Sequence, residues 1–315
     1  MTHRVTACRP TVLGLPVDAL SLAEAVARVS AQIDQQNTCQ QARHSPDPLR
    51  RQRAQIGAPP APTTQVGSLH LMDGESAADD AATAAPSDAA TPRLWQIVTL
   101  QPEIVMRARR TPDLWAIIQR APLVTADGMG IVWALRLRGV RAPERVTGVD
   151  LLAALAQRAA TRGYRLFLLG GAPGIAEQAG VALQRRYPGL LVAGAWAGSP
   201  DPADDAEARR RIRAARPDLL CVAYGAPAQE RWIARVGPAL VADRQRGIVA
   251  IGVGGALDLL AGRIPRAPLW MQRVGFEWLY RLARQPWRWR RMVALPRFAA
   301  LACAEAWQTR AERRR

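Results

Sequence analysis

GYRLFLLGGAPG, residues 163–174, is a short apolar run that ends in glycines, and it sets the pattern for this chain of 315 residues. On either side of it, similar runs alternate with polar segments of helical length: WQIVTL (95–100), APLVTADG (121–128), GLLVAG (189–194), DLLCVAYG (218–225) and GIVAIGVGG (247–255). Apolar runs that alternate with helices are typical of a parallel sheet with helices on its faces. The sequence therefore predicts an α/β fold with a mostly parallel sheet.

Several of these runs end in glycine or in a polar residue. In a Rossmann-like sheet with helices on both faces, the carboxyl ends of the strands meet helix N-termini, and ligands bind along that edge. We therefore expect the functional site at the carboxyl edge of the sheet.

The N-terminal part of this fold, residues 1–35, contains a strand-like stretch over 11–20 and a helix that starts at Ser21 and runs to about Gln35. Ser21 and Glu24 have the spacing of a capping box, which supports the helix start. Residues 36–93 then lose all periodicity and are rich in Gln, Pro, Ser, Asp and Ala. This composition predicts a disordered insertion within one domain.

The sheet-forming core is expected over residues 94–262, and residues 263–315 form a C-terminal appendage that is rich in arginine and tryptophan. The appendage carries 13 Arg against 3 Glu, and five of the ten tryptophans, in a chain that has no lysine and a net charge of +17. We expect helices there, broken at Pro286 and Pro296. Tryptophan sits at headgroup depth and guanidinium groups pair with lipid phosphate, so an anionic membrane surface is the expected partner. The alternative is a solvated basic surface with its tryptophans in a core.

Composition and short motifs argue against several other classes of protein. No stretch approaches the roughly 18 apolar residues of a spanning helix, and the N-terminus lacks the apolar core of a secretory signal. We therefore expect a cytoplasmic protein, peripheral on the inner face of the membrane. The cysteines are scattered without CxxC spacing, which predicts isolated thiols and neither a zinc site nor a disulfide: Cys8, Cys39, Cys221 and Cys303. The glycine spacings form neither GxGxxG nor a P-loop, which argues against NAD and ATP.

Asp127 is the carboxylate that stands out, because it closes a strand-like run and is followed by Gly128 and Gly130. Glycines at such a point let the backbone approach a ligand, and an aspartate there is placed to act as a general base. An aspartate at the same point can also cap a helix that begins near Met129. The local pattern fits both interpretations.

Three more polar segments follow expected strand ends, and each is a candidate for contact with a nucleotide sugar: Thr99 with Gln101, Gly170 with Gly171, and Gln229 with Glu230. A glycine pair after a strand is also a common tight turn, and a Gln-Glu pair can simply cap a helix. Taken singly, each segment fits either role.

Taken together, six segments in order resemble the WecG/TagA/CpsF glycosyltransferases, also called glycosyltransferase family 26: DGMGIVWALRLRG (127–139), ERVTGVDLL (144–152), FLLGGAPG (167–174), GAPAQERWI (225–233), GVGGALDLLAGRIPRAP (252–268) and FEWLYRLARQPWRWRR (276–291). The resemblance covers about residues 94–293, with Val12 to Gln35 as its opening.

The resemblance implies a metal-independent, inverting glycosyltransferase without a cofactor. The implied donor is UDP-N-acetylmannosamine, and the implied acceptor is undecaprenyl diphosphate carrying N-acetylglucosamine, whose 4-hydroxyl is glycosylated in cell-surface polysaccharide or teichoic-acid-type biosynthesis. The alternative is transfer of UDP-glucose or a UDP-uronate to a lipid-linked oligosaccharide. A second copy of the chain, in a homo-oligomer, is the expected protein partner.

The resemblance also assigns residues. It makes Asp127 the base, and it places Thr99 and Gln229 in the substrate pocket and Asp258 near the nucleotide. It also implies that the arginine-rich appendage covers the active site and touches the membrane. Without a metal, the diphosphate charge must be stabilised by helix N-termini and arginines. The further predicted substrate contacts are Gln101, Arg145, Thr147, Gly148, Gly170, Gly171, Glu230, Arg266, Arg281, Arg284, Arg288 and Arg291.

The chain departs from the family pattern at several positions. Gln101 stands where the family's T-x-N motif has asparagine, Ala228 replaces the lysine of PKQE, and Gly198-Ser199 replaces a glycine-aromatic pair. The insertion over 36–93 has no recognised counterpart. These changes bear on the identity of the donor more than on the reaction class.

Two other classes of protein share some of these features. Arginine clusters interleaved with tryptophan can bind nucleic acid, but here the charge is concentrated at the end of the chain and the six ordered motifs have no role in such a protein. No nucleic-acid partner is therefore expected. A dinucleotide-dependent oxidoreductase would need the glycine fingerprint that the sequence lacks.

Overall fold

The structure is a computed structural model in which the described residues are 9–43, 93–141, 143–242, 247–274, 276–284, 286 and 289–312. The expected disordered insertion lies outside the described residues from position 44 to position 92.

The centre of the fold is a six-stranded sheet in which every paired strand is parallel to its neighbours. Its order is β4-β3-β8-β7-β5-β6. The strands are β3 (Leu94–Leu100), β4 (Leu123–Ala126), β5 (Arg165–Gly170), β6 (Leu191–Trp196), β7 (Leu219–Ala223) and β8 (Ile248–Gly252). The six apolar runs are thus the six strands, and the predicted α/β fold is confirmed.

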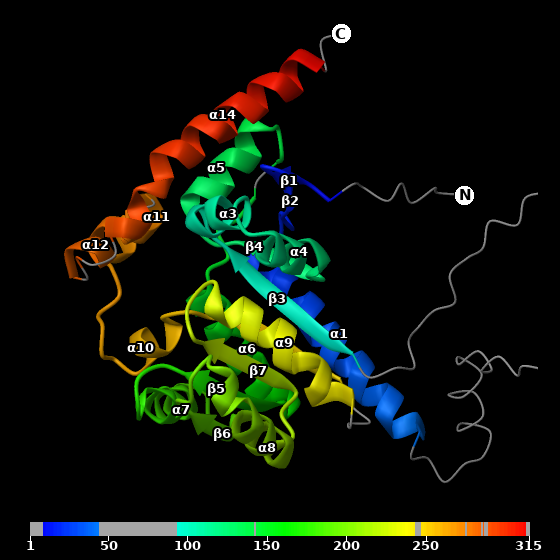
Figure 1. The fold of residues 1–315 in the computed structure, drawn as a ribbon. Helices are drawn as coiled ribbons and strands as arrows, with labels where there is room; N and C mark the ends of the chain where they lie inside the picture. Colours follow the sequence, from blue (N-terminus) through cyan, green and yellow to red (C-terminus); the bar gives the residue numbers. More distant parts are fainter. Residues whose placement is uncertain are drawn as a thin grey trace, which may run out of the picture.

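Helices cover both faces of the sheet (Figure 1). One face packs against α1 (Leu22–Arg43), α6 (Gly148–Arg162), α7 (Ile175–Arg186) and α10 (Ala256–Leu260). The other face packs against α8 (Asp205–Ala215) and α9 (Ala228–Ala242) at one end and against α3 (Pro102–Ala108), α4 (Pro112–Arg120) and α5 (Met129–Leu137) at the other. Both faces are buried, which explains why the strands read as continuous apolar runs.

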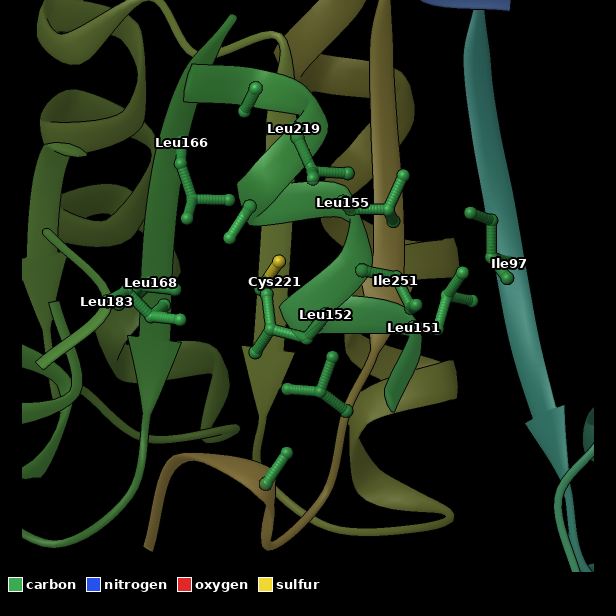
Figure 2. Close-up of a cluster of buried hydrophobic side chains, with 14 of the residues drawn as sticks. Ile97, Leu151, Leu152, Leu155, Leu166, Leu168, Leu183, Leu219, Cys221 and Ile251 are labelled. Atoms are coloured by element: carbon green, nitrogen blue, oxygen red, sulfur yellow. The ribbon is translucent and has the colours of Figure 1, made fainter. Parts of the chain in front are cut away.

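The packing of α6 on the sheet is typical of this core. Figure 2 shows Leu152 and Leu155 of α6 lying over Cys221 and Ile251 of the neighbouring strands β7 and β8, and all four side chains are buried. Burial raises the pKa of the Cys221 thiol, so this cysteine behaves as a small apolar residue. Cys221 and Cys303 are free thiols, as expected for cysteines without CxxC spacing.

The N-terminal segment differs in two respects from the prediction. The stretch over 11–20 is a small antiparallel hairpin of β1 (Thr11–Val12) and β2 (Leu15–Pro16), because Leu13 and Gly14 turn the chain with positive φ angles of 49° and 82°. The capping box of Ser21 and Glu24 is present. The Ser21 N–H donates to Glu24 Oε2 at 2.7 Å, and the Glu24 N–H donates to Ser21 Oγ at 3.2 Å. Helix α1, however, continues to Arg43 instead of ending near Gln35.

The C-terminal appendage is helical, as predicted, with α11 (Leu269–Val274), α12 (Glu277–Arg284), α13 (Trp289–Met292) and α14 (Ala294–Glu312). The expected break at Pro296 is wrong, because this proline lies in the first turn of α14, where its missing N–H has no helical partner to lose. Helix α14 packs on α3 and α5 and buries Phe298 and Ala302 (Figure 1). Within the part of the chain that the structure describes, no helix is long and apolar enough to cross a bilayer.

Candidate active site

A cavity of about 350 Å³ lies where β3, β4, β7 and β8 end, which is the edge that the sequence predicts for the site. The appendage forms part of its wall through Glu277, Trp278, Met292 and Leu295. The cavity brings together eight of the predicted site residues, namely Thr99, Gln101, Asp127, Arg145, Thr147, Gly148, Gln229 and Asp258.

Asp127 is held at the end of β4 and lines this cavity. Its backbone N–H donates to the carbonyl of Leu100 at 2.9 Å, and Gln101 Nε2 donates to its Oδ2 at 2.9 Å. The N-cap of α5 is Gly128, with φ 120°, so the helix-capping interpretation of Asp127 is wrong. The carboxylate is therefore oriented by Gln101 beside the cavity, where it can accept a proton from a bound hydroxyl group.

Thr99 and Gln229 brace the turn after β8. Gln229 Oε1 accepts from the Gly254 N–H at 2.9 Å, and Thr99 Oγ1 donates to the Gly252 carbonyl at 3.0 Å. A Cβ at Gly252 would lie 2.5 Å from Gln229 Nε2, so this position needs glycine. These two polar side chains shape the glycine-rich turn that forms one wall of the cavity.

Glu230 is buried behind Gln229 and is not among the cavity-lining residues. Its Oε1 accepts from Gln229 Nε2 at 2.8 Å, whereas its Oε2 is buried without a hydrogen-bond partner. Burial raises the pKa of Glu230 and outweighs the hydrogen bond from Gln229, which favours the neutral carboxyl. Its observed contact is therefore with Gln229, which it helps to orient.

A network of paired charges joins the appendage to the start of α6. Arg145 bonds Glu277 of α12 at 3.0 Å, and Arg266 binds both oxygens of Asp150 at 2.6 and 2.9 Å. Arg266 Nε also lies 4.0 Å from Glu277 Oε1. Thr147 caps α6 by accepting from the Asp150 N–H at 3.1 Å. Arg266 thus supports the cavity from behind without lining it.

Asp150 and Glu277 are not among the residues predicted from sequence, although both lie in segments that carry the family resemblance. The spacing of Thr147 and Asp150 is a usable signal, because a threonine followed three residues later by a carboxylate often caps a helix. The pairing of Arg145 with Glu277 spans 132 residues and has no local signature.

Replacing Arg266 by Gln should destabilise the protein by about 1–2 kcal/mol at neutral pH, the range for a partly exposed charged pair. Burial raises the pKa of Asp150, but hydrogen bonds from Arg266 and Thr147 outweigh it and hold the pKa below its ordinary value of 3.8. A lowered pKa stabilises the fold above 3.8, and that contribution is lost as the pH falls through the folded-state value. Urea unfolding at pH 7 and pH 3 should therefore show a smaller difference between variant and parent in acid. The matched control Arg210→Gln, which breaks a more exposed pair with Glu207, should cost less at pH 7.

Gly170 and Gly171 are predicted contacts that are not among the cavity-lining residues. They form a tight turn after β5, with φ angles of 105° and 82°. A Cβ at Gly170 would lie 2.7 Å from the backbone carbonyl carbon of Ala223 on the neighbouring strand. The positive φ angles and the close approach of Ala223 both require glycine at this turn, so these residues have a role in the fold.

The Gly170→Ala variant should lose about 2–4 kcal/mol of unfolding free energy, because it combines left-handed backbone strain with a backbone clash. The control is Gly163→Ala, at φ 69° with open space around the added Cβ, which should cost about 1 kcal/mol. The free energy of unfolding is measured with denaturant. If both variants lost the same amount, the backbone clash at position 170 would not contribute to the loss.

The other predicted arginines lie in the appendage. Arg284 is exposed and stacks on Tyr280, with 5.6 Å between its guanidinium carbon and the ring centroid. The side chains of Arg281, Arg288 and Arg291 are outside the described residues. Across the described ranges, no group of three His, Cys, Asp or Glu side chains could hold a metal ion. A reaction without metal stays a prediction.

An open parallel sheet with a cavity at the carboxyl ends of its strands is the arrangement of ligand-binding α/β enzymes. Residues 67–312 match the family described as "Glycosyl transferase WecG/TagA/CpsF family". The chain belongs to this family and is a glycosyltransferase. The match starts before residue 94 and ends after residue 293, so it is longer than the resemblance in the motifs.

Two similar proteins carry the name N-acetylglucosaminyldiphosphoundecaprenol N-acetyl-beta-D-mannosaminyltransferase. The protein of Bacillus subtilis (strain 168) is 32% identical over 209 residues, which cover 66% of this chain and 79% of that protein. The protein of Bacillus spizizenii (strain ATCC 23059 / NRRL B-14472 / W23) is 34% identical over 202 residues, which cover 64% and 76%.

Proposed function

We propose that the protein transfers N-acetylmannosamine from UDP to the 4-hydroxyl of N-acetylglucosamine on undecaprenyl diphosphate, with inversion and without a metal. The names of the two Bacillus relatives support the transferred sugar and the acceptor. The observation that carries the proposal is the position of Asp127, which lines the cavity at the end of β4 and is oriented by Gln101.

The proposed reaction is a single displacement. Asp127 removes the proton of the acceptor hydroxyl, whose oxygen forms a bond to the anomeric carbon of the donor while the bond to UDP breaks. Inversion needs one base on the acceptor side, in contrast to the nucleophile and acid/base pair of a retaining enzyme. The hydrogen bond from Gln101 fixes the carboxylate without supplying a second acidic group.

The UDP leaving group gains negative charge during transfer, and the start of α6 is suited to stabilise it. Gly148 and Val149 line the cavity in the first turn of this 15-residue helix. Backbone N–H groups in the first turn of a helix can donate hydrogen bonds to an anion that binds there. Arg145 adds a guanidinium group at the same place, held by Glu277. The appendage arginines Arg281, Arg284, Arg288 and Arg291 remain proposed contacts for the same charge.

We also propose that the protein acts at the inner face of the cytoplasmic membrane through the appendage. Large apolar side chains are exposed there, among them Trp270, Phe276, Trp289 and Val293 at 62, 47, 56 and 65%. Exposed tryptophans among arginines suit a surface of anionic headgroups, where the lipid-linked acceptor would lie.

The proposal is tested by single-turnover measurement of UDP release with a short-chain prenyl-diphosphate-N-acetylglucosamine acceptor, in EDTA. The donors are UDP-N-acetylmannosamine, UDP-glucose and a UDP-uronate, because Gln101 and Ala228 depart from the family pattern. Release with UDP-N-acetylmannosamine that persists in EDTA is expected. Release with another donor would replace the proposed sugar, and loss of release in EDTA would overturn metal independence.

A further inference from the structure

A second cavity, of about 500 Å³, lies beside the first one. It is bounded by α3, by the start of α14 and by the turn at Ala226 and Pro227. The two cavities share four lining residues: Gln101, Glu103, Ile104 and Ala226. Gln101 lines both cavities and also donates a hydrogen bond to Asp127, so the second cavity adjoins the wall that carries the proposed base.

Three arginines line the second cavity, Arg107 and Arg110 from α3 and the following turn and Arg297 from the first turn of α14. All three are exposed, and no ion pair joins any of them to a carboxylate within the described part of the chain. Glu103 is the one carboxylate among the lining residues of this cavity. This differs from the first cavity, where Arg145 is paired with Glu277. The balance of charge in the second cavity favours an anion.

The chemistry of these groups narrows the class of anion. A guanidinium group is planar and can bind two phosphate oxygens at once, so several arginines around one cavity suit a diphosphate. Apolar side chains line the same cavity, including Met106, Ala294 and Val293, and Val293 is 65% exposed. A diphosphate that carries an apolar tail would use both kinds of surface.

We propose that the second cavity binds the diphosphate of the prenyl-linked acceptor, with Arg107, Arg110 and Arg297 as its ligands. This inference rests on the proposed function. In the acceptor, the attacking 4-hydroxyl and the diphosphate are at opposite ends of one sugar ring. With the hydroxyl beside Asp127, the sugar spans the shared wall of the two cavities and the diphosphate reaches the arginines. The prenyl chain then leaves over Val293, and the donor diphosphate stays in the first cavity near α6.

The test is the double variant Arg107→Gln/Arg110→Gln in the full-length protein, with a water-soluble short-chain prenyl-diphosphate-N-acetylglucosamine and no vesicles. The KM for this acceptor should rise by about 100-fold, because each of the two lost charge-assisted contacts contributes about tenfold. The KM for the UDP-sugar should change by less than about threefold. Binding of the same acceptor, measured by calorimetry without donor, should weaken by the same factor. The matched control is Arg109→Gln/Arg120→Gln, which removes the same two positive charges from the ends of α3 and α4, at exposed residues that line neither cavity.

Each outcome separates this site from its alternatives. A similar loss in Arg109→Gln/Arg120→Gln would mean that general surface charge attracts the acceptor. A raised KM for the UDP-sugar would assign Arg107 and Arg110 to the donor. Either result overturns the proposal. Unchanged acceptor binding by the double variant, with weaker sedimentation on phosphatidylglycerol vesicles, would assign them to phospholipid headgroups and also overturn it. If the acceptor binds through these arginines but no donor sugar is transferred to it, the subsite stands and the proposed function fails.

Discussion

The Asp127→Asn variant should turn over about 10² to 10⁴ times more slowly than the parent enzyme, the usual contribution of a general base. Asparagine keeps the shape of the side chain and an oxygen that can accept the hydrogen bond from Gln101 Nε2. The protein should therefore fold normally and bind UDP with nearly unchanged affinity. What is lost is the group that removes the proton from the attacking hydroxyl.

The measurement is the single-turnover rate of UDP release, together with calorimetric binding of UDP. The control is Glu177→Gln, which makes the same chemical change at an exposed position of α7 outside both cavities and should leave the rate within about twofold. A rate for Asp127→Asn within about threefold of the parent would remove Asp127 from the role of base. A loss of UDP affinity as large as the loss of rate would instead make it a binding residue.

The sheet and its ligand-binding edge were predictable because they depend on simple periodic features. Parallel strands that are covered by helices on both faces read as apolar runs, and parallel strands end at the same edge. That reasoning also brings Thr99, Asp127 and Gln229 together, although they are far apart in the sequence. Local pattern could not choose between base and helix cap for Asp127, because both roles place an aspartate between a strand and a helix. Gly128 takes the cap position, which removes the cap interpretation, and the role of Asp127 as base stays a prediction.

The features that the sequence did not reveal depend on tertiary packing. The same glycine-rich pattern follows β5 and β8, yet Gly254 lines the cavity while Gly170 lies against Ala223 of the adjacent strand. The Arg266–Asp150 pair joins residues 116 positions apart, and charge alone does not identify the partner. Pro296 resembles a helix breaker in the sequence, but it lies where a helix begins.

The role of the appendage at the membrane must be tested by substitution, because α14 also belongs to the core of the protein. Phe298 and Ala302 of α14 are buried against α3 and α5, so deletion of residues 263–315 would expose this core and confuse unfolding with loss of docking. Trp270 and Trp289 offer a cleaner test, because they are 62 and 56% exposed and line neither the first nor the second cavity. Their removal should leave the fold intact.

The Trp270→Ser/Trp289→Ser variant should bind anionic vesicles about 100-fold more weakly, since each large aromatic side chain withdrawn from water contributes roughly tenfold. Sedimentation with phosphatidylglycerol vesicles measures this, and turnover of a short-chain acceptor in solution should stay near the parent rate because the site is untouched. Trp307→Ser is the control, since Trp307 is 79% exposed but lies about 20 Å along α14 from its start at Ala294. Equal weakening by the control would show that vesicle binding is not confined to the α11–α13 end of the appendage. Full vesicle binding by the double variant would mean that the arginines bind the membrane without help from these two tryptophans.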